Sequence, residues 1–153
     1  MALYLVQHGK SLSADVDPER SLSAEGIAEV ERVAKAASNY WIRLSLIQHS
    51  GKKRAEQTAQ IFAKNTNPRN GIQQRDGLNP LDDVIPIARK MDSDENLMLV
   101  RHLPFMERLA SFLITGIAEK PVFRFKNGSI LCLDKHPDTR TWVIEWALMP
   151  NIA

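Results

Sequence analysis

Short apolar runs alternate with longer amphipathic stretches through the first two thirds of the chain. The runs at 3–6, 44–48 and 97–100 have the length of strands, and the first and last are suited to burial on both faces of a sheet. A brief fourth strand is predicted at 72–75. Four helices are predicted from apolar spacing and caps: from Ser21 or Ser23 to 41, from 52 or 53 to about 64, from Asp82 or Asp83 to 91, and from 103 to 115.

The last third of the chain has a different pattern. Residues 122–125, 129–133 and 141–148 are strand-like, and the turn-forming residues Asn127-Gly128 and His136-Pro137 separate them, which indicates hairpins. Strands that alternate with helices and then give way to a meander predict an α/β fold. We therefore expect three layers: a mainly parallel central sheet with antiparallel C-terminal strands, and helices on both faces.

Composition narrows the class of protein. The 153 residues are 44% hydrophobic and 25% charged, which is typical of one globular domain over 1–153, and the net charge of +2 is too small to indicate nucleic-acid binding. The single cysteine, Cys132, excludes a disulfide framework. Since no apolar run has the length of a membrane span, we expect a cytoplasmic protein that does not bind membranes.

Two of the predicted strands end in the same way. Gln7, His8 and Gly9 follow the first strand, and Arg101 and His102 follow the strand at 97–100. Ligands of open α/β sheets usually bind at the carboxyl ends of the strands, and parallel neighbours would bring both imidazoles to one edge. The simpler interpretation is that each histidine only caps its strand.

Three cations gather where the second helix begins. Lys52, Lys53 and Arg54 stand at the positive end of the helix dipole, where each is disfavoured by about 0.3 to 1 kcal/mol. A bound anion would remove this conflict. For Lys52 and Lys53, extension into water is the preferred interpretation, which leaves Arg54 as the candidate anion ligand.

These motifs occur together, in order, in a short chain. With the segment Arg54-Ala-Glu-Gln-Thr-Ala and the Leu-Ser-x-x-Gly sequence at 22–26, they resemble the histidine phosphatase superfamily, and within it the short SixA-type phosphohistidine phosphatases. The resemblance spans nearly the whole chain. It implies a phosphoglycerate-mutase-like fold, with a nucleophilic histidine at His8 and a second site histidine at His102.

The chemistry of these residue types is consistent with the resemblance. A neutral imidazole is a competent nucleophile, so His8 is predicted to form a covalent phosphohistidine that water then hydrolyses. Phosphoryl transfer otherwise needs positive groups around three oxygens. Arg54 offers a bidentate guanidinium, and His102 a donor. The predicted phosphate-binding residues are Gln7, Gly9, Arg54 and Arg101, with no metal or other cofactor.

One departure from the family weakens this prediction. The first family motif is Arg-His-Gly, and Gln7 replaces its arginine, which removes one cation from the site. The alternative function is therefore a phosphate- or phosphohistidine-binding domain with weakened catalysis. Arg101 could supply the missing charge, although strand alternation argues that it points away from His102.

Other classes of site fit the sequence less well. Gly9-Lys10-Ser11 resembles the end of a P-loop, but Tyr4 stands where that motif needs glycine. A zinc site from His8, His49, His102 and His136 lacks the usual ligand spacing. By resemblance, the expected substrate is phosphohistidine on a phosphotransfer domain or a phosphocarrier in signal transduction, and the expected state is a monomer.

Overall fold

The computed structural model describes residues 2–76, 81–91 and 95–151. Six strands form one sheet in the order β3-β2-β4-β1-β5-β6. Their bounds are β1 Leu3–Gln7, β2 Leu46–His49, β3 Ile72–Gln74, β4 Leu97–Arg101, β5 Ile130–Lys135 and β6 Trp142–Leu148. The first four in chain order run parallel, and β5 pairs antiparallel with both β1 and β6. The α/β class and the mixed sheet predicted from the sequence are confirmed.

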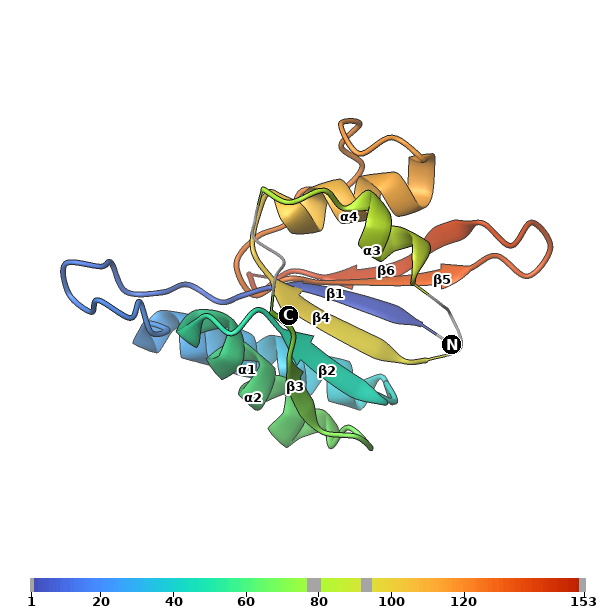
Figure 1. The fold of residues 1–153 in the computed structure, drawn as a ribbon. Helices are drawn as coiled ribbons and strands as arrows, with labels where there is room; N and C mark the ends of the chain where they lie inside the picture. Colours follow the sequence, from blue (N-terminus) through green and yellow to red (C-terminus); the bar gives the residue numbers. More distant parts are fainter. Residues whose placement is uncertain (1, 77–80, 92–94, 152–153) are drawn as a thin grey trace.

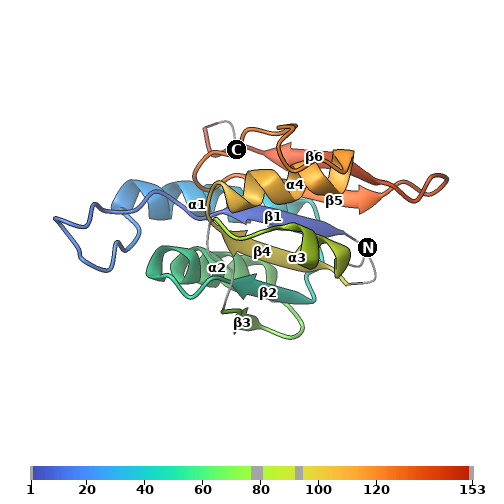
Figure 2. The same ribbon diagram turned by 45° about the horizontal axis from the view of Figure 1, so that its top comes forward.

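Helices cover both faces of this sheet, as Figures 1 and 2 show. Their bounds are α1 Ala24–Asn39, α2 Lys53–Thr66, α3 Ile85–Arg89 and α4 Phe105–Thr115. Helices α1 and α2 lie on one face, and α3 and α4 on the other (Figure 1). No helix within the described residues combines the length and apolar character that crossing a bilayer requires.

Strand alternation divides the core between the two faces. In β1, Tyr4 and Val6 pack in the cluster beneath α1 and α2, while Leu3 and Leu5 pack in the cluster beneath α3 and α4. All five residues of β1 are buried, as predicted for a strand covered on both sides. Because side chains alternate along a strand, residue 7 points to the α4 face.

Helix α1 begins where the sequence indicated. The hydroxyl of Ser23 accepts a hydrogen bond from the Gly26 N–H at 3.0 Å, so Ser23 is the N-cap. Gly26 has a packing role, because a Cβ there would overlap the carbonyl oxygen of Lys10. The helix ends two residues before Trp41, which lies outside it with a φ of 59°.

Three details of the predicted elements are wrong. Residues 122–125 form no strand: Phe125 is buried, and its ring packs against Phe123 with centroids 4.8 Å apart. Trp41, expected on the inner face of the first helix, is 87% exposed. The third helix spans only Ile85–Arg89.

Candidate active site

The two strand-end histidines lie side by side. Strands β1 and β4 are parallel neighbours in which Gln7 pairs with Arg101, and the rings of His8 and His102 are 4.8 Å apart between centroids. The predicted meeting of the two imidazoles at one edge of the sheet is confirmed. In β5, Leu133 pairs with Leu3 at the start of β1, and His136 follows the end of β5. His136 therefore lies at the end of the sheet opposite to His8 and His102.

The backbone holds the His8 ring in one tautomer. Its Nδ1 lies 2.7 Å from the carbonyl oxygen of Gly9, and a carbonyl only accepts, so Nδ1 carries the hydrogen. In a neutral ring Nε2 then has a free lone pair. The pKa of His8 is lowered from 6.5 to about 4, mainly by burial and also by the charges of Arg54 and Arg20, while the Gly9 hydrogen bond acts in the opposite direction. His8 is therefore neutral at pH 7.

Gly9 connects the end of β1 to helix α2. Its N–H donates to Thr58 Oγ1 at 3.0 Å, and that hydroxyl donates to the carbonyl oxygen of Arg54 at 2.8 Å. A side chain at residue 9 would place its Cβ 2.7 Å from Val30. Both polar backbone groups of Gly9 thus have partners in the protein. In this structure Gly9 orients the His8 ring and fixes its distance from α2.

His102 is held by a residue that the sequence analysis missed. Its Nε2 lies 2.6 Å from the hydroxyl oxygen of Ser50, which also accepts the Lys52 N–H at 3.4 Å. The Ser50 hydroxyl can donate to Nε2 or accept from it, according to the tautomer of His102, and in either case the contact orients the ring. Nδ1 is buried and has no hydrogen-bond partner among the described residues.

The electrostatic surroundings of His102 favour its neutral form. Its pKa is lowered to about 3, mainly by burial and in part by four neighbouring groups: His8, Arg54, Lys52 and Arg101. A neutral ring donates one hydrogen bond and carries no charge of its own. An anion bound here would reverse the effect of the surrounding cations.

Arg54 lies in the first turn of α2, as predicted, and is partly buried. Its Nε is buried without a hydrogen-bond partner in the described part of the chain. Burial lowers its pKa, and the charge of Arg20 lowers it further. Positive groups that repel one another around two neutral imidazoles form a site suited to an anion such as phosphate.

Arg20 is the second residue that sequence reasoning missed. It stands in the loop that follows β1, with a left-handed φ of 53°, and its charge lowers the pKa of both His8 and Arg54. The base of that loop is fixed by an antiparallel bridge between Ser11 and Leu22. Leu22 in turn donates its N–H to Gln57 Oε1 at 2.7 Å. The sequence feature that could have indicated Arg20 is its place just before the Leu-Ser-x-x-Gly segment.

Arg101 is almost fully buried, with 1% of its surface exposed. Its Nη2 donates to the Arg75 carbonyl oxygen at 3.4 Å, and its guanidinium carbon lies 5.8 Å from the centre of the Phe105 ring. Burial lowers its pKa to about 10. Its charge lowers the pKa of His102 and of His49, so its field reaches the site.

His49 also ends a strand, β2, and is the other histidine to be weighed as a nucleophile. It is 5% exposed, and its Nδ1 accepts the Gly51 N–H at 3.1 Å. Burial lowers its pKa as well. Gly51 has a φ of 90°, which favours glycine at this turn. His49 is therefore part of the turn rather than of the open edge.

Comparison with known proteins agrees with this geometry. A model of the histidine phosphatase superfamily (branch 1) matches residues 3–82, more than half of the chain. The chain therefore belongs to the histidine phosphatase superfamily, a family of phosphatases. A search of curated protein sequences finds no match.

Solved structures of SixA proteins share this fold. The protein histidine phosphatase SixA complexed with tungstate has a TM-score of 0.81 at 23% identity, over 99% of this chain and 98% of that one. A putative phosphohistidine phosphatase SixA from Agrobacterium tumefaciens has a TM-score of 0.76 at 25% identity, with 97% of each chain covered. A mycobacterial glucosyl-3-phosphoglycerate phosphatase has a TM-score of 0.67 at 16% identity, over 95% of this chain and 97% of that one.

Proposed function

We propose that the protein removes phosphate from phosphohistidine on a protein, through a covalent phosphohistidine on His8. The observation that carries this proposal is the state of the His8 ring. Its Nδ1–H is held by the Gly9 carbonyl oxygen, its pKa is lowered to about 4, and its Nε2 lone pair is free. A neutral, oriented imidazole beside cations is what attack on a phosphoryl group needs.

The proposed reaction has two steps. Nε2 of His8 forms a bond to phosphorus while the bond from phosphorus to the substrate imidazole breaks, and the leaving imidazole takes up a proton from water. Water then attacks the phosphorus of phospho-His8, which releases phosphate and restores the ring. Arg54 and His102 hold the phosphoryl oxygens, with Gln7 beside them and Arg101 adding positive potential.

Phosphohistidine is the preferred substrate because its leaving group is undemanding. An imidazole leaves far more readily than the alkoxide of a sugar phosphate, so it needs less help from an acid. The acidic residues near β3 are Asp76, Asp82 and Asp83, and Asp76 is already bonded to Gln74. Efficient hydrolysis of sugar phosphates, without release of phosphate from a phosphohistidine protein, would contradict the assignment.

The alternative is a binding domain with little or no turnover, because Gln7 stands where the family has arginine. Losing one preorganised donor typically lowers the rate about 10² to 10³-fold. A single-turnover experiment separates the two functions. A phosphotransfer domain phosphorylated with phosphoramidate is mixed with excess protein, and both free phosphate and phospho-His8 are measured.

An enzyme releases phosphate and transiently carries the label on His8, whereas a binding domain does neither. His8→Ala should abolish release without changing the melting temperature, because His8 lies at the edge of the sheet. His49→Gln serves as the matched control and should keep turnover. Loss of turnover in His49→Gln with normal turnover in His8→Ala would overturn the assignment of the nucleophile.

A further inference from the structure

A cleft opens beside His8, on the side toward β5. Its volume is about 460 Å³, and it reaches from Gln7 at the end of β1 to Lys10 and Glu29 on one wall and Arg124 and Lys126 on the other. We call it the basic cleft. None of its wall residues was part of the predicted site except Gln7.

The inner end of the basic cleft presents a polar group without a partner. Gln7 is 8% exposed, and its Oε1 is buried with no hydrogen-bond partner in the described part of the chain. A buried amide normally has its hydrogen bonds satisfied. This oxygen only accepts hydrogen bonds, so an N–H of a bound protein, such as a backbone amide, is the partner that suits it.

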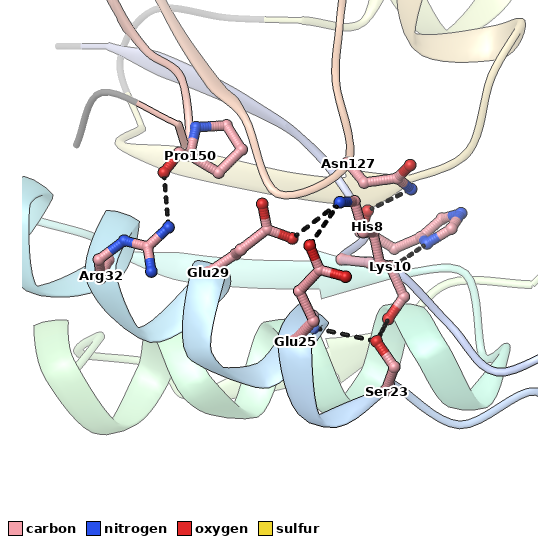
Figure 3. Close-up of polar contacts among 10 residues, drawn as sticks. His8, Lys10, Ser23, Glu25, Glu29, Arg32, Asn127 and Pro150 are labelled. Carbon is pink, nitrogen blue, oxygen red and sulfur yellow. Dashed lines mark hydrogen bonds and ion pairs between the residues drawn. The ribbon is translucent and has the colours of Figure 1, made fainter.

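The segment that carries the two cations is fixed to the end of β1. Asn127 Nδ2 donates to the carbonyl oxygen of His8 at 3.1 Å, and the Gly128 N–H donates to that of Gln7 at 3.0 Å. Figure 3 shows Asn127 directly beside His8. Asn127 and Gly128 therefore tie the chain that follows Arg124 and Lys126 to the proposed nucleophile.

The charges on the two walls are not balanced. Lys10 lies 2.9 Å from Glu25 and 3.6 Å from Glu29, so these acids are already paired (Figure 3). Arg124 and Lys126 are exposed and make no ion pair with any other residue that the structure describes. The basic cleft thus has an excess of positive charge beside the site.

We propose that the basic cleft docks carboxylate side chains that flank the phosphohistidine of the protein substrate. This inference rests on the proposed function, and it assigns Arg124 and Lys126 to substrate recognition rather than to chemistry. Opposite charges across such a surface raise the rate of encounter and select the partner. A free phosphohistidine has no flanking side chains, so the cleft distinguishes a protein substrate from the free amino acid.

The test compares two double charge reversals. The cleft variant combines Arg124→Glu with Lys126→Glu. The control variant combines Lys35→Glu with Arg43→Glu, which changes the net charge by the same amount at exposed residues toward and beyond the C-terminal end of α1. The substrates are a histidine phosphotransfer domain with acidic neighbours, phosphorylated with phosphoramidate, and free phosphohistidine. The cleft variant should raise KM for the protein at least about tenfold, and leave free phosphohistidine unchanged.

Two further measurements make the result specific. Replacing the acidic neighbours on the substrate by their amides should remove the difference between the cleft variant and the wild type. Higher salt should raise KM for the wild type and affect the cleft variant little. An equal effect of both double variants on the protein substrate, or an equal loss on free phosphohistidine, overturns the proposal.

Docking and hydrolysis can fail separately. If the wild type releases no phosphate from either substrate, the proposed function is wrong. Docking is then measured as binding of the phosphorylated domain to His8→Ala protein, with and without the cleft substitutions. A dissociation constant that the cleft substitutions leave unchanged excludes the cleft as the docking surface.

Discussion

The hydroxyl oxygen of Ser50 lies 2.6 Å from Nε2 of His102, and this contact fixes the orientation of the His102 ring. The same oxygen accepts the Lys52 N–H at 3.4 Å, which ties it to the start of α2. Ser50 is therefore a positioning residue: it acts through His102, which holds a phosphoryl oxygen in the proposed reaction.

We predict that Ser50→Ala lowers kcat/KM about tenfold, the effect of one hydrogen bond of about 1.4 kcal/mol. Ser50→Thr keeps the hydroxyl and should keep most of the activity. Nitrogen-15 NMR of His102 distinguishes positioning from a loss of structure, because Ser50→Ala should populate both neutral tautomers in a folded protein. An unchanged tautomer in Ser50→Ala would refute this role.

A second prediction concerns pH. Folding lowers the pKa of His8 from 6.5 to about 4 and that of His102 to about 3, mainly through burial. NMR titration of the free protein should therefore show both rings neutral at pH 5.5, where an ordinary histidine is largely protonated. A ring of His8 that titrates near its ordinary value would remove the main support for the nucleophile.

The same shifts affect stability. Between the folded and unfolded pKa values the unfolded chain binds more protons, so the free energy of unfolding should rise with pH up to about 6.5 and decline as the pH falls toward 4. Denaturant unfolding at pH 4.5 and pH 7 measures the difference. His49, whose pKa burial also lowers, contributes in the same direction. In His102→Asn the dependence on pH should be smaller, since one of these contributing groups is gone.

The third prediction concerns Gln7 and Arg101, which pair across β1 and β4. If Arg101 supplies the charge that Gln7 lacks, Arg101→Met should weaken phosphate binding about tenfold or more and raise the pKa of His102. Gln7→Arg should partly restore binding. Calorimetry with inorganic phosphate measures both, and Arg89→Met is the surface control. A harmless Arg101→Met means that Arg101 only fills the core beside Phe105.

The fourth prediction concerns Arg20. Its charge lowers the pKa of His8 and of Arg54, so Arg20→Asn should weaken phosphate binding about tenfold, while Arg20→Lys keeps part of it. Asparagine tolerates the left-handed φ of residue 20, which limits any change in the loop. Equal phosphate affinity in Arg20→Asn and wild type would exclude Arg20 from the anion site.

Much of the fold was predictable because the burial of each strand is visible in its own sequence. The apolar run before His8 reads as a central strand, and the similar run before His102 as its parallel neighbour, which was enough to bring the two rings together. The error at 122–125 has the same origin. Phe123 and Phe125 pack on the α4 side of the core. Their apolar pattern therefore reports burial, and from the sequence alone it looks the same as the pattern of a paired strand.

The parts of the site that could not be predicted depend on contacts between distant segments. Ser50 meets His102 across 52 positions, and Thr58 meets Gly9 across 49. A serine or threonine that bonds to the site looks like any other in the sequence. The turn after β2 brings the Ser50 hydroxyl to the His102 ring, and the packing of α2 brings the Thr58 hydroxyl to the Gly9 N–H.

The loop between β1 and α1 is closed at its base. Leu12 N–H donates to the Ser21 carbonyl oxygen at 2.8 Å, Ser23 N–H donates to that of Lys10 at 3.0 Å, and Gly26 lets the helix lie directly on Lys10. Residues 13–19 extend beyond this closure (Figure 1). Segments of other lengths can therefore be grafted there without moving His8, and the loop is a natural place to engineer a protein with a new choice of substrate.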